Sequence, residues 1–548
     1  MAFLQGWPAF PLAAAAIATA VARQSGAELR EESLVASTCF WGAVLAAVAL
    51  ALEFLLLRET GLNATEHAKN EDATMVWREE KGVSVLVPLL PDAKGKAQEP
   101  LPRFTMAEVA KHNTRDDLWI IVDGRVYDVT NYVSKHPGGD LPIEDMAGKD
   151  CTDVFANYHA ARVYKHMLPP YLVGEVSDFV VYPHVTDFRE IRQELLRRGL
   201  FETDMRSYLK LGTWLSFLLF GALWLSLGAT TSRRMGGAAM TGVFWQQLAG
   251  IGHDLGHSAV THVFWLDHVI GSTLCSLMGI STCWWKKNHN THHVVCNSVE
   301  HDPDIQHMPI FAVSEKIFEK PFWSTFYTKW VVMDRLAKLL VTYQHILLYP
   351  VMAVARFNLY AQSIIQLLAG ERLHYRRLEF CAFACYFSWV LALAMSMPTW
   401  AQAVGWLLVS HSVSGILHVQ IVIGHFSMDT YHGHAYNNDK DEWYITQLKT
   451  TMNVLTPAWL DWLHIGLQFQ IEHHMYPRLP RHNLRHAREL VKAVCAKHKI
   501  PYVEQGFFDC NLKTLRKLRL TGFAAHASKR GESGFFESAL WDGLTLSG

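Results

Sequence analysis

Three short clusters of histidine stand out in this sequence of 548 residues, which contains 29 histidines in all. Histidine is the commonest metal ligand in proteins. On a helix, residues four apart share a face, whereas adjacent histidines diverge by about 100° and therefore suit two neighbouring metals. The clusters read HDLGH, HNTHH and QIEHH, and they supply His253, His257, His289, His292, His293, His473 and His474. Seven histidines are too many for one ion, so the pattern predicts a pair of metal ions.

A second histidine motif lies nearer the N-terminus. His136 opens the run HPGG, and His159 follows 23 residues later. HPGG by itself would indicate a turn, since glycine permits the backbone to bend. Together with the upstream run DLWIIVDGRVYDVTNY, however, the segment from about residue 103 to about 178 resembles the haem-binding domain of cytochrome b5. The resemblance implies that His136 and His159 are the axial ligands of haem b. Such a haem has no open coordination position, so it carries electrons and does not activate oxygen.

The haem domain bears on the choice of metal in the histidine clusters. Imidazole ligands suit iron, copper, zinc and nickel, so the ligand type alone leaves the metal open. A fused electron carrier implies a supply of electrons, which zinc cannot use. We therefore expect two non-haem iron ions.

Half of the residues are hydrophobic and only 18% are charged, a composition that suits a membrane protein with soluble parts. Four apolar stretches are therefore the candidate elements that position the histidine clusters. The stretches cover residues 211–231, 235–252, 380–398 and 400–424. A helix over the first is about 31 Å long, which matches the roughly 30 Å of a bilayer's hydrocarbon core. Very short connections predict two transmembrane hairpins. Interrupted apolar stretches at 259–282 and 339–368 are typical of helices at the membrane surface.

Basic residues precede both hairpins, and cytoplasmic segments are enriched in lysine and arginine. HDLGH follows the first hairpin, HNTHH lies between the hairpins and QIEHH follows the second. All three clusters are therefore predicted at the cytosolic boundary, as one metal centre requires. The basic residues are Arg189, Arg192, Arg197, Arg198, Arg206 and Lys210 before the first hairpin, and Arg372, Arg376 and Arg377 before the second.

The chain divides into five predicted parts. The predicted fold is an α-helical membrane protein, with four core transmembrane helices in two hairpins and a cytosolic diiron cap, plus an N-terminal α+β cytochrome b5-like domain. In the haem domain, Thr105 and Glu108 predict a capping box, and Asp123-Gly124 predicts a hairpin turn. The parts are a hydrophobic extension with one or two spans (1–60), a linker (61–102), the haem domain (103–178), the membrane domain (205–500) and a C-terminal tail (501–548).

From about residue 103 to about residue 520 the sequence resembles the front-end desaturases, which carry a cytochrome b5 domain ahead of three histidine boxes. Gln470 replaces the first histidine of the third box, as is usual in that group. The resemblance adds His425 as a metal ligand and names Gln470 and Asn453 as residues near the metal pair. It implies O2 as oxidant and electrons from NADH through a separate cytochrome b5 reductase. It also implies an endoplasmic reticulum membrane, although residues 1–57 could direct the chain to a plastid.

The runs NSVEHDPDIQHMPIFAVS and DWLHIGLQFQIEHHMYPRLPR are similar to plant-type members. That subgroup contains delta-8 sphingolipid desaturases, which we favour, and delta-6 and delta-5 acyl desaturases. A lipid hydroxylase is an alternative because it uses the same oxidant. A membrane metal transporter is an alternative of another class, but the haem domain would have no purpose there. The net charge of −1 gives no indication of nucleic-acid binding. Nine scattered cysteines indicate a reduced, cytosol-facing protein.

Overall fold

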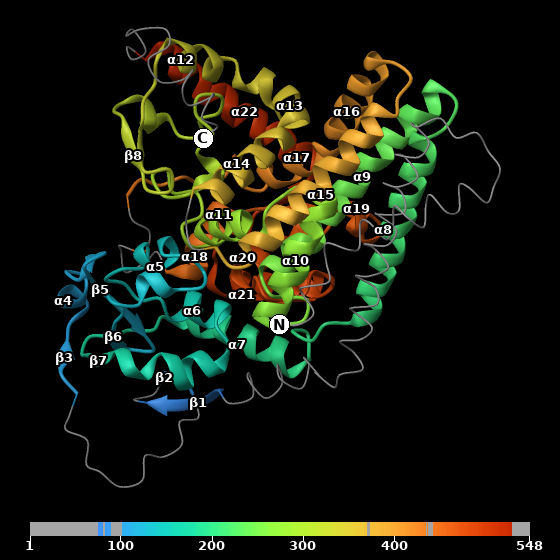
Figure 1. Ribbon diagram of the computed structural model, residues 1–548. Helices are drawn as coiled ribbons and strands as arrows, with labels where there is room; N and C mark the ends of the chain where they lie inside the picture. The colour runs from blue at the N-terminus through green and yellow to red at the C-terminus, as the bar shows by residue number, and fades with distance from the viewer. Residues whose placement is uncertain are drawn as a thin grey trace.

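The computed structural model describes residues 75–80, 83–88, 101–369, 373–433, 436 and 442–528. The predicted N-terminal extension, residues 1–60, lies outside this described part. A small mixed domain, drawn in blue and teal, lies against a larger helical body drawn from green to red (Figure 1).

The small domain contains a five-stranded sheet in the order β3-β7-β6-β5-β4. Thr105 caps helix α4 (Met106–Val109) and exchanges hydrogen bonds with Glu108, so the predicted capping box is confirmed. Asp123 and Gly124 both have positive φ, 52° and 70°, at the hairpin turn between β5 and β6. The predicted turn is confirmed as well. The strands are β3 (Arg103–Phe104), β4 (Asn113–Thr114), β5 (Asp117–Val122), β6 (Arg125–Asp128) and β7 (Leu172–Val176).

Short helices and turns connect β6 to β7 and carry the two predicted haem ligands. Helix α6 (Thr152–Tyr158) ends directly before His159, and α5 (Leu141–Glu144) follows the HPGG turn. After β7 the chain enters α7 (Pro183–Arg197), which packs on α21 (Leu484–His498) of the helical body.

Three helices of the described part are long and apolar enough to cross a membrane, namely α8 (Met205–Ser226), α15 (Arg376–Met395) and the continuous pair α16–α17 (Trp400–Val422). A bent pair, α12 (Arg335–Thr342) with α13 (Gln344–Val354), could count as a fourth span. The chain is an integral membrane protein.

The second predicted span lies within α9 (Thr231–Gly256), which is helical but does not meet the same criterion of length and composition. Its sequence interleaves glycine, threonine and glutamine with the apolar residues, and two arginines stand near its start. Helix α9 packs against both α8 and α16 (Figure 1). The helix pairing of the first predicted hairpin is therefore present, but the predicted arrangement of four core transmembrane helices in two hairpins is not confirmed.

Two of the basic residues that precede the first predicted hairpin lie inside the protein. Arg189 and Arg192 are both buried. Arg189 donates two hydrogen bonds to Asp153 of α6, at 2.7 and 2.9 Å. This ion pair joins the small domain to the helical body.

The remaining helices include α11 (Thr282–Val294) and α20 (Gln470–Met475), which carry the second and third histidine clusters. They also include α10 (Phe264–Met278), α14 (Arg356–Leu368), α18 (Trp443–Thr450) and α19 (Asp461–His464). The short apolar helix α10 and the helices α12 to α14 coincide with the two stretches predicted to lie at the membrane surface.

Residues 504–527, within the described portion of the predicted C-terminal tail (501–548), form a strand and a helix that pack into the fold. Strand β11 (Glu504–Gly506) pairs in parallel with β10 (Asn453–Leu455). Helix α22 (Phe507–Ala527) packs on α12 and α13. Helix α22 buries an apolar face that includes Leu518 and Cys510. The prediction of a tail did not take this face into account.

The segment predicted as a linker also contains secondary structure. Strands β1 (Met75–Glu80) and β2 (Val83–Pro88) form an antiparallel pair within residues 61–102. The linker prediction was therefore incomplete.

Candidate metal centre and haem site

The first and second histidine clusters are placed by two helix ends. His253 lies in the last turn of α9, and His257 is the residue that caps the C-terminus of the same helix. Ser281 caps the N-terminus of α11 by accepting a hydrogen bond from the backbone of Trp284, at 3.0 Å. Helix α11 then carries HNTHH in its last two turns.

The third cluster sits on α20, a helix of six residues in which every residue is buried. His473 and His474 point in different directions, since their rings are perpendicular with centroids 5.8 Å apart. Each can therefore join a different group of ligands, as the sequence predicted for adjacent histidines.

Together the three clusters form two groups of metal-ligating atoms, and within each group these atoms lie within 4.8 Å of one another. His425, from the turn after α17, joins the second group as expected. The first group is His253, His257, His289 and His473, and the second is His292, Cys296, His425 and His474.

His293 lies between the two groups. Its Nε2 is 3.0 Å from Nε2 of His289 in the first group. Its ring stacks on His474 of the second group, with the centroids 4.0 Å apart. All seven histidines predicted from the boxes, with His425, therefore converge on one buried region.

Several ring nitrogens in this region are buried and have no hydrogen-bond partner. A buried polar atom without a partner costs about 1–3 kcal/mol, which makes such a concentration in one place unusual for a purely structural cluster. Bound metal ions would satisfy these lone pairs, so the donor set fits a pair of metals. The unpartnered atoms are Nε2 of His253, both ring nitrogens of His257, Nδ1 of His293, and Nε2 of His473 and His474.

The two predicted haem ligands, His136 and His159, also converge. The rings of His136 and His159 face one cavity with centroids 5.9 Å apart. Nδ1 of His136 is bonded to the carbonyl of Gly139 at 2.6 Å, and Nδ1 of His159 to that of Phe155 at 3.1 Å. Each ring thus keeps Nε2 free for a metal.

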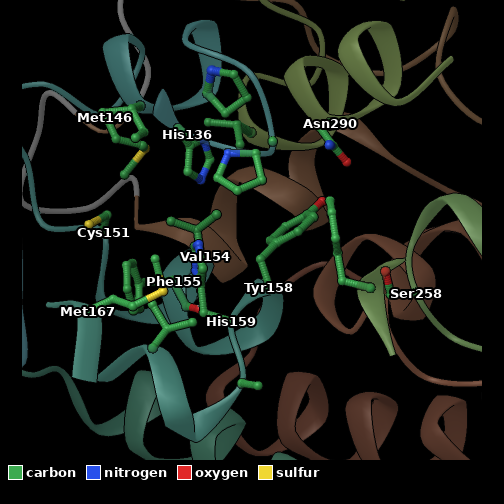
Figure 2. A pocket seen from close by; sticks show the side chains of 18 of the residues that line it. His136, Met146, Cys151, Val154, Phe155, Tyr158, His159, Met167, Ser258 and Asn290 are labelled. Atoms are coloured by element: carbon green, nitrogen blue, oxygen red, sulfur yellow. Dashed lines mark hydrogen bonds between the residues drawn. The ribbon is translucent and has the colours of Figure 1, made fainter. Parts of the chain in front are cut away.

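Residues around the two histidines suit a flat apolar group. A Cβ on Gly138 would come within 2.8 Å of the His136 ring, so glycine is needed there. The cavity wall is mainly apolar and includes Ile120, Val129, Val154, Phe155 and Leu168. The residues present therefore fit a haem (Figure 2).

Comparison with known proteins agrees with this geometry. The family model described as fatty acid desaturase matches residues 230–506, and the model for the cytochrome b5-like haem/steroid-binding domain matches residues 105–177. The chain belongs to the fatty acid desaturase family.

Curated relatives of this desaturase match most of both chains. The Delta(8)-fatty-acid desaturase of Helianthus annuus is 37% identical over 77% of this chain and 92% of its own length. The Delta 8-(E)-sphingolipid desaturase of Kluyveromyces lactis is 36% identical over 72% of this chain and 69% of its own. Among solved structures, the cytochrome b5 of Ostreococcus tauri virus 2 is 40% identical over 14% of this chain and 95% of that one, with a TM-score of 0.13.

Acidic and amide groups outside the ligand set orient the histidines of the desaturase. Nδ1 of His292 lies 2.9 and 3.0 Å from the two carboxylate oxygens of Asp302. Nδ1 of His474 lies 2.9 Å from Oε1 of Gln447. In both rings this contact engages Nδ1, so that Nε2 is the nitrogen that would bind a metal.

The electrostatics differ across the site. Burial disfavours a charge on His292, but the carboxylates of Asp302 and Asp304 outweigh burial and raise the pKa of His292 to about 9. The same negative field favours a bound cation. Burial and neighbouring histidines hold the pKa of His293 and His474 well below the usual range, so both are neutral and their lone pairs are available.

Sequence reasoning did not identify Cys296, Asp302 or Gln447 as site residues. Cys296 is fully buried, and its Sγ lies 3.5 Å from Nδ1 of His425. Cys296 lies only three residues after His293, and this closeness to the second histidine cluster could have marked it as a candidate ligand. Gln447 comes from α18, far from its partner in sequence, and only the tertiary structure reveals it.

Asp254 and Glu472, which each directly precede or follow a box histidine in the sequence, are both buried. Asp254 accepts hydrogen bonds from Tyr208 at 2.7 Å and Arg481 at 2.6 Å, and it lies 3.5 Å from Nδ1 of His253. Glu472 contacts Asn453, at 2.7 Å.

The two residues predicted near the metal pair, Gln470 and Asn453, are also buried. Asn453 donates to Glu472 and to Tyr502, each at 2.7 Å, and its Oδ1 accepts from the backbone of Ile471 at 3.0 Å. Asn453 therefore fixes the start of α20. Gln470 opens the same helix and packs its side chain over Gly424.

Proposed function

We propose that this desaturase inserts a double bond into the long-chain base of a sphingolipid, at the delta-8 position. Support comes from the names of its relatives, among them the Delta 8-(E)-sphingolipid desaturases of Kluyveromyces lactis and of Komagataella phaffii, the latter 40% identical over 75% of this chain. The observation that carries the chemistry is the convergence of eight histidines beside a haem-type cavity, seven of them in two groups and His293 between the groups.

In this proposal the two groups of ligands hold two iron ions, with His293 between them. When bound, the irons would activate O2 so that hydrogen is taken from two adjacent methylene groups of the lipid chain. Asp302 and Gln447 keep the ring nitrogens of His292 and His474 in the tautomer that binds metal. Burial of the ligands keeps water away from the reaction and so prevents side reactions. Gln470 and Asn453 contribute from outside the ligand set by placing the third box.

His136 and His159 hold the haem that supplies electrons to this centre. We propose NADH as the electron source, through a separate cytochrome b5 reductase, and the endoplasmic reticulum as the membrane, with both metal sites on the cytosolic side. The fused haem domain supports this route. Because the chain already contains its electron carrier, it needs only a separate enzyme that reduces the haem.

An acyl substrate is the second candidate function. The Acyl-lipid (9-3)-desaturase of Borago officinalis is 36% identical over 77% of this chain and 94% of its own length. A delta-6 or delta-5 acyl desaturase would use the same ligands, since the position of the double bond depends on how the chain is held and not on the metal centre. A lipid hydroxylase would also use them.

A lipid profile of a host that lacks polyunsaturated lipids tests the proposal. Fatty acids and sphingoid bases are measured separately by mass spectrometry, with and without the protein, and an inactive His292→Ala variant serves as the control. A new double bond in the long-chain base is the expected result. A new double bond in a fatty acid would instead establish the acyl reading, and a product that gains oxygen would contradict desaturation itself.

A further inference from the structure

The haem cavity extends beyond the small domain and is closed by residues of the helical body. One wall carries the haem ligands and the apolar residues around them. The opposite wall comes from the end of α9, the loop that follows it, α11 and the segment after α20. Its residues are His257, Ser258, His262, Lys286, Asn290 and Arg478. Because His257 belongs to the first group of metal ligands, the cavity reaches from one redox site to the other.

Tyr158 stands at the boundary between the two sites. It is the last residue of α6 and directly precedes His159. Figure 2 shows its side chain between the haem ligands on one side and Asn290 and Ser258 on the other. Its ring centroid lies 6.4 Å from that of His257 and 6.3 Å from that of His293. Aromatic rings at such separations are in packing contact.

Contacts along the junction between the small domain and the helical body hold Tyr158 in position. The buried Arg189–Asp153 pair ties α6 to α7 of the helical body. A second pair joins the small domain to the loop after α11, with Nδ1 of His301 3.0 Å from the carboxylate of Asp145. Buried apolar residues of both parts also share one core cluster, which includes Val154 and Val294.

The tyrosine hydroxyl is not what holds the residue in place. It is buried and has no hydrogen-bond partner in the described structure. Leaving a polar group buried in this way costs about 1–3 kcal/mol, so replacing it with hydrogen should be tolerated. The ring, by contrast, fills the space between the haem ligand and two histidines of the metal centre.

We propose that Tyr158 is a positioning residue that bridges the haem and the metal centre, and that electrons cross between the two sites through its packed ring. The inference rests on the proposed function, because it assumes haem and iron in their sites. Each transfer oxidises one ferrous haem iron to ferric and reduces one ferric iron of the pair to ferrous, and no bond or proton changes. Without the ring, a gap or water would separate the sites and weaken their electronic contact.

The rate of haem oxidation, followed optically, tests this bridge. The sample is the purified full-length protein in nanodiscs made from the expression host's total lipid extract. The haem is reduced without oxygen and then mixed with oxygenated buffer, and its absorbance is followed. Iron-depleted protein gives the background rate at which oxygen oxidises the haem directly. The variants are Tyr158→Phe, which keeps the ring, and Tyr158→Leu and Tyr158→Met, which remove it. The flexible methionine side chain best fills the space that the ring leaves.

Tyr444→Leu is the matched control. Tyr444 is buried in the same shared core, where its ring packs on Phe188 and Tyr476. Its loss therefore measures the effect of a hole near the domain junction. Haem absorbance, haem reduction potential and iron content of each variant show whether the two sites remain intact.

The expected result is a fast, iron-dependent phase of haem oxidation in the parent, in Tyr158→Phe and in Tyr444→Leu. Tyr158→Leu and Tyr158→Met should lose this phase while keeping haem, potential and iron. Retention of the fast phase in either of those variants would overturn the bridge but leave the proposed function standing. Absence of an iron-dependent phase in the parent would overturn the electron route of the proposed function, and the bridge with it.

Discussion

Individual residues in this desaturase divide into those that offer lone pairs to metal and those that hold them in place. His292 shows the division clearly, because its Nδ1 faces Asp302 and its other nitrogen faces the ligand group. Asp302 in turn accepts backbone hydrogen bonds from Asn297 and Asp304, at 2.6 and 2.8 Å. The carboxylate is thus fixed on several sides, and a fixed carboxylate fixes the imidazole.

Substitutions at this pair should separate the two roles. His292→Ala removes a ligand and should abolish the unsaturated product, with the haem spectrum unchanged. Asp302→Asn keeps the ligand but loses the orienting charge, and we expect about a 10–100-fold loss of activity or iron affinity, as is typical for such partners. Product is measured by mass spectrometry and iron by elemental analysis.

His526→Ala is the control for that series, since His526 is exposed near the end of α22. Desaturation that persists in His292→Ala would rule out the metal assignment. Full iron content in Asp302→Asn would show that the hydrogen bond to His292 does not tune the metal.

At the scale of elements, α21 and the β10–β11 pair together set the position of the third histidine box. Asn453 at the start of β10 binds the start of α20 through its contacts with Ile471 and Glu472. Glu504 at the start of β11 accepts hydrogen bonds from Arg488 of α21, at 2.5 and 3.1 Å, and is paired with Lys492. A charged contact outside the site therefore supports the strand pair from which Asn453 reaches the box.

This contact gives the stability of the fold a predictable pH dependence. Burial acts to raise the pKa of Glu504, but hydrogen bonds from Lys492 and Arg488 outweigh it and lower that pKa below its ordinary value of 4.5. A depressed folded-state pKa stabilises the fold above pH 4.5, and this stabilisation is lost as the pH falls through the folded-state value.

Glu504→Gln should therefore lower the melting temperature of the purified protein at pH 7. The difference between parent and variant should shrink as the pH falls from 4.5 through the folded-state pKa of Glu504, because the parent carboxylate then becomes protonated as well. Thermal unfolding in detergent at a series of pH values measures both. An equal difference at all pH values would show that the charge of Glu504 is not its source.

For the whole molecule, the main feature is that two cofactor sites share one interior. The small domain packs closely against the helical body. Buried residues of both parts form a common core, and a buried ion pair crosses the junction. The haem-type cavity opens towards His257. The two sites are thus adjacent in space but have separate ligands.

Separate ligands mean that the two metals can be removed independently. A membrane-impermeant iron chelator applied to the purified chain should abolish desaturation and leave the haem absorbance unchanged. Ferrous iron should restore activity and zinc should not, since zinc takes no part in redox chemistry. If zinc restored the product, or if the chelator bleached the haem, the assignment of the histidine groups to a non-haem iron pair would be wrong.

Much of this protein is determined by its sequence alone. The histidine spacing and the HPGG motif identify the ligand types, because metal ligands are few in kind and helix periodicity fixes their relative directions over one or two turns. The capping box at Thr105 and the turn at Asp123-Gly124 are also local, so their residues suffice to predict them. The helices α8, α15 and α16–α17 follow from long apolar runs.

The tertiary structure alone decided which distant groups meet. Gln447 belongs to the site because α18 packs against α20. Asp302 belongs to it because the loop after α11 folds back onto His292, and Cys296 because that loop also meets His425. The integration of α22 and the burial of Arg189 likewise depend on partners far along the chain. Packing between distant segments also places Tyr158 against His257 and His293, and it is this contact that joins the two sites.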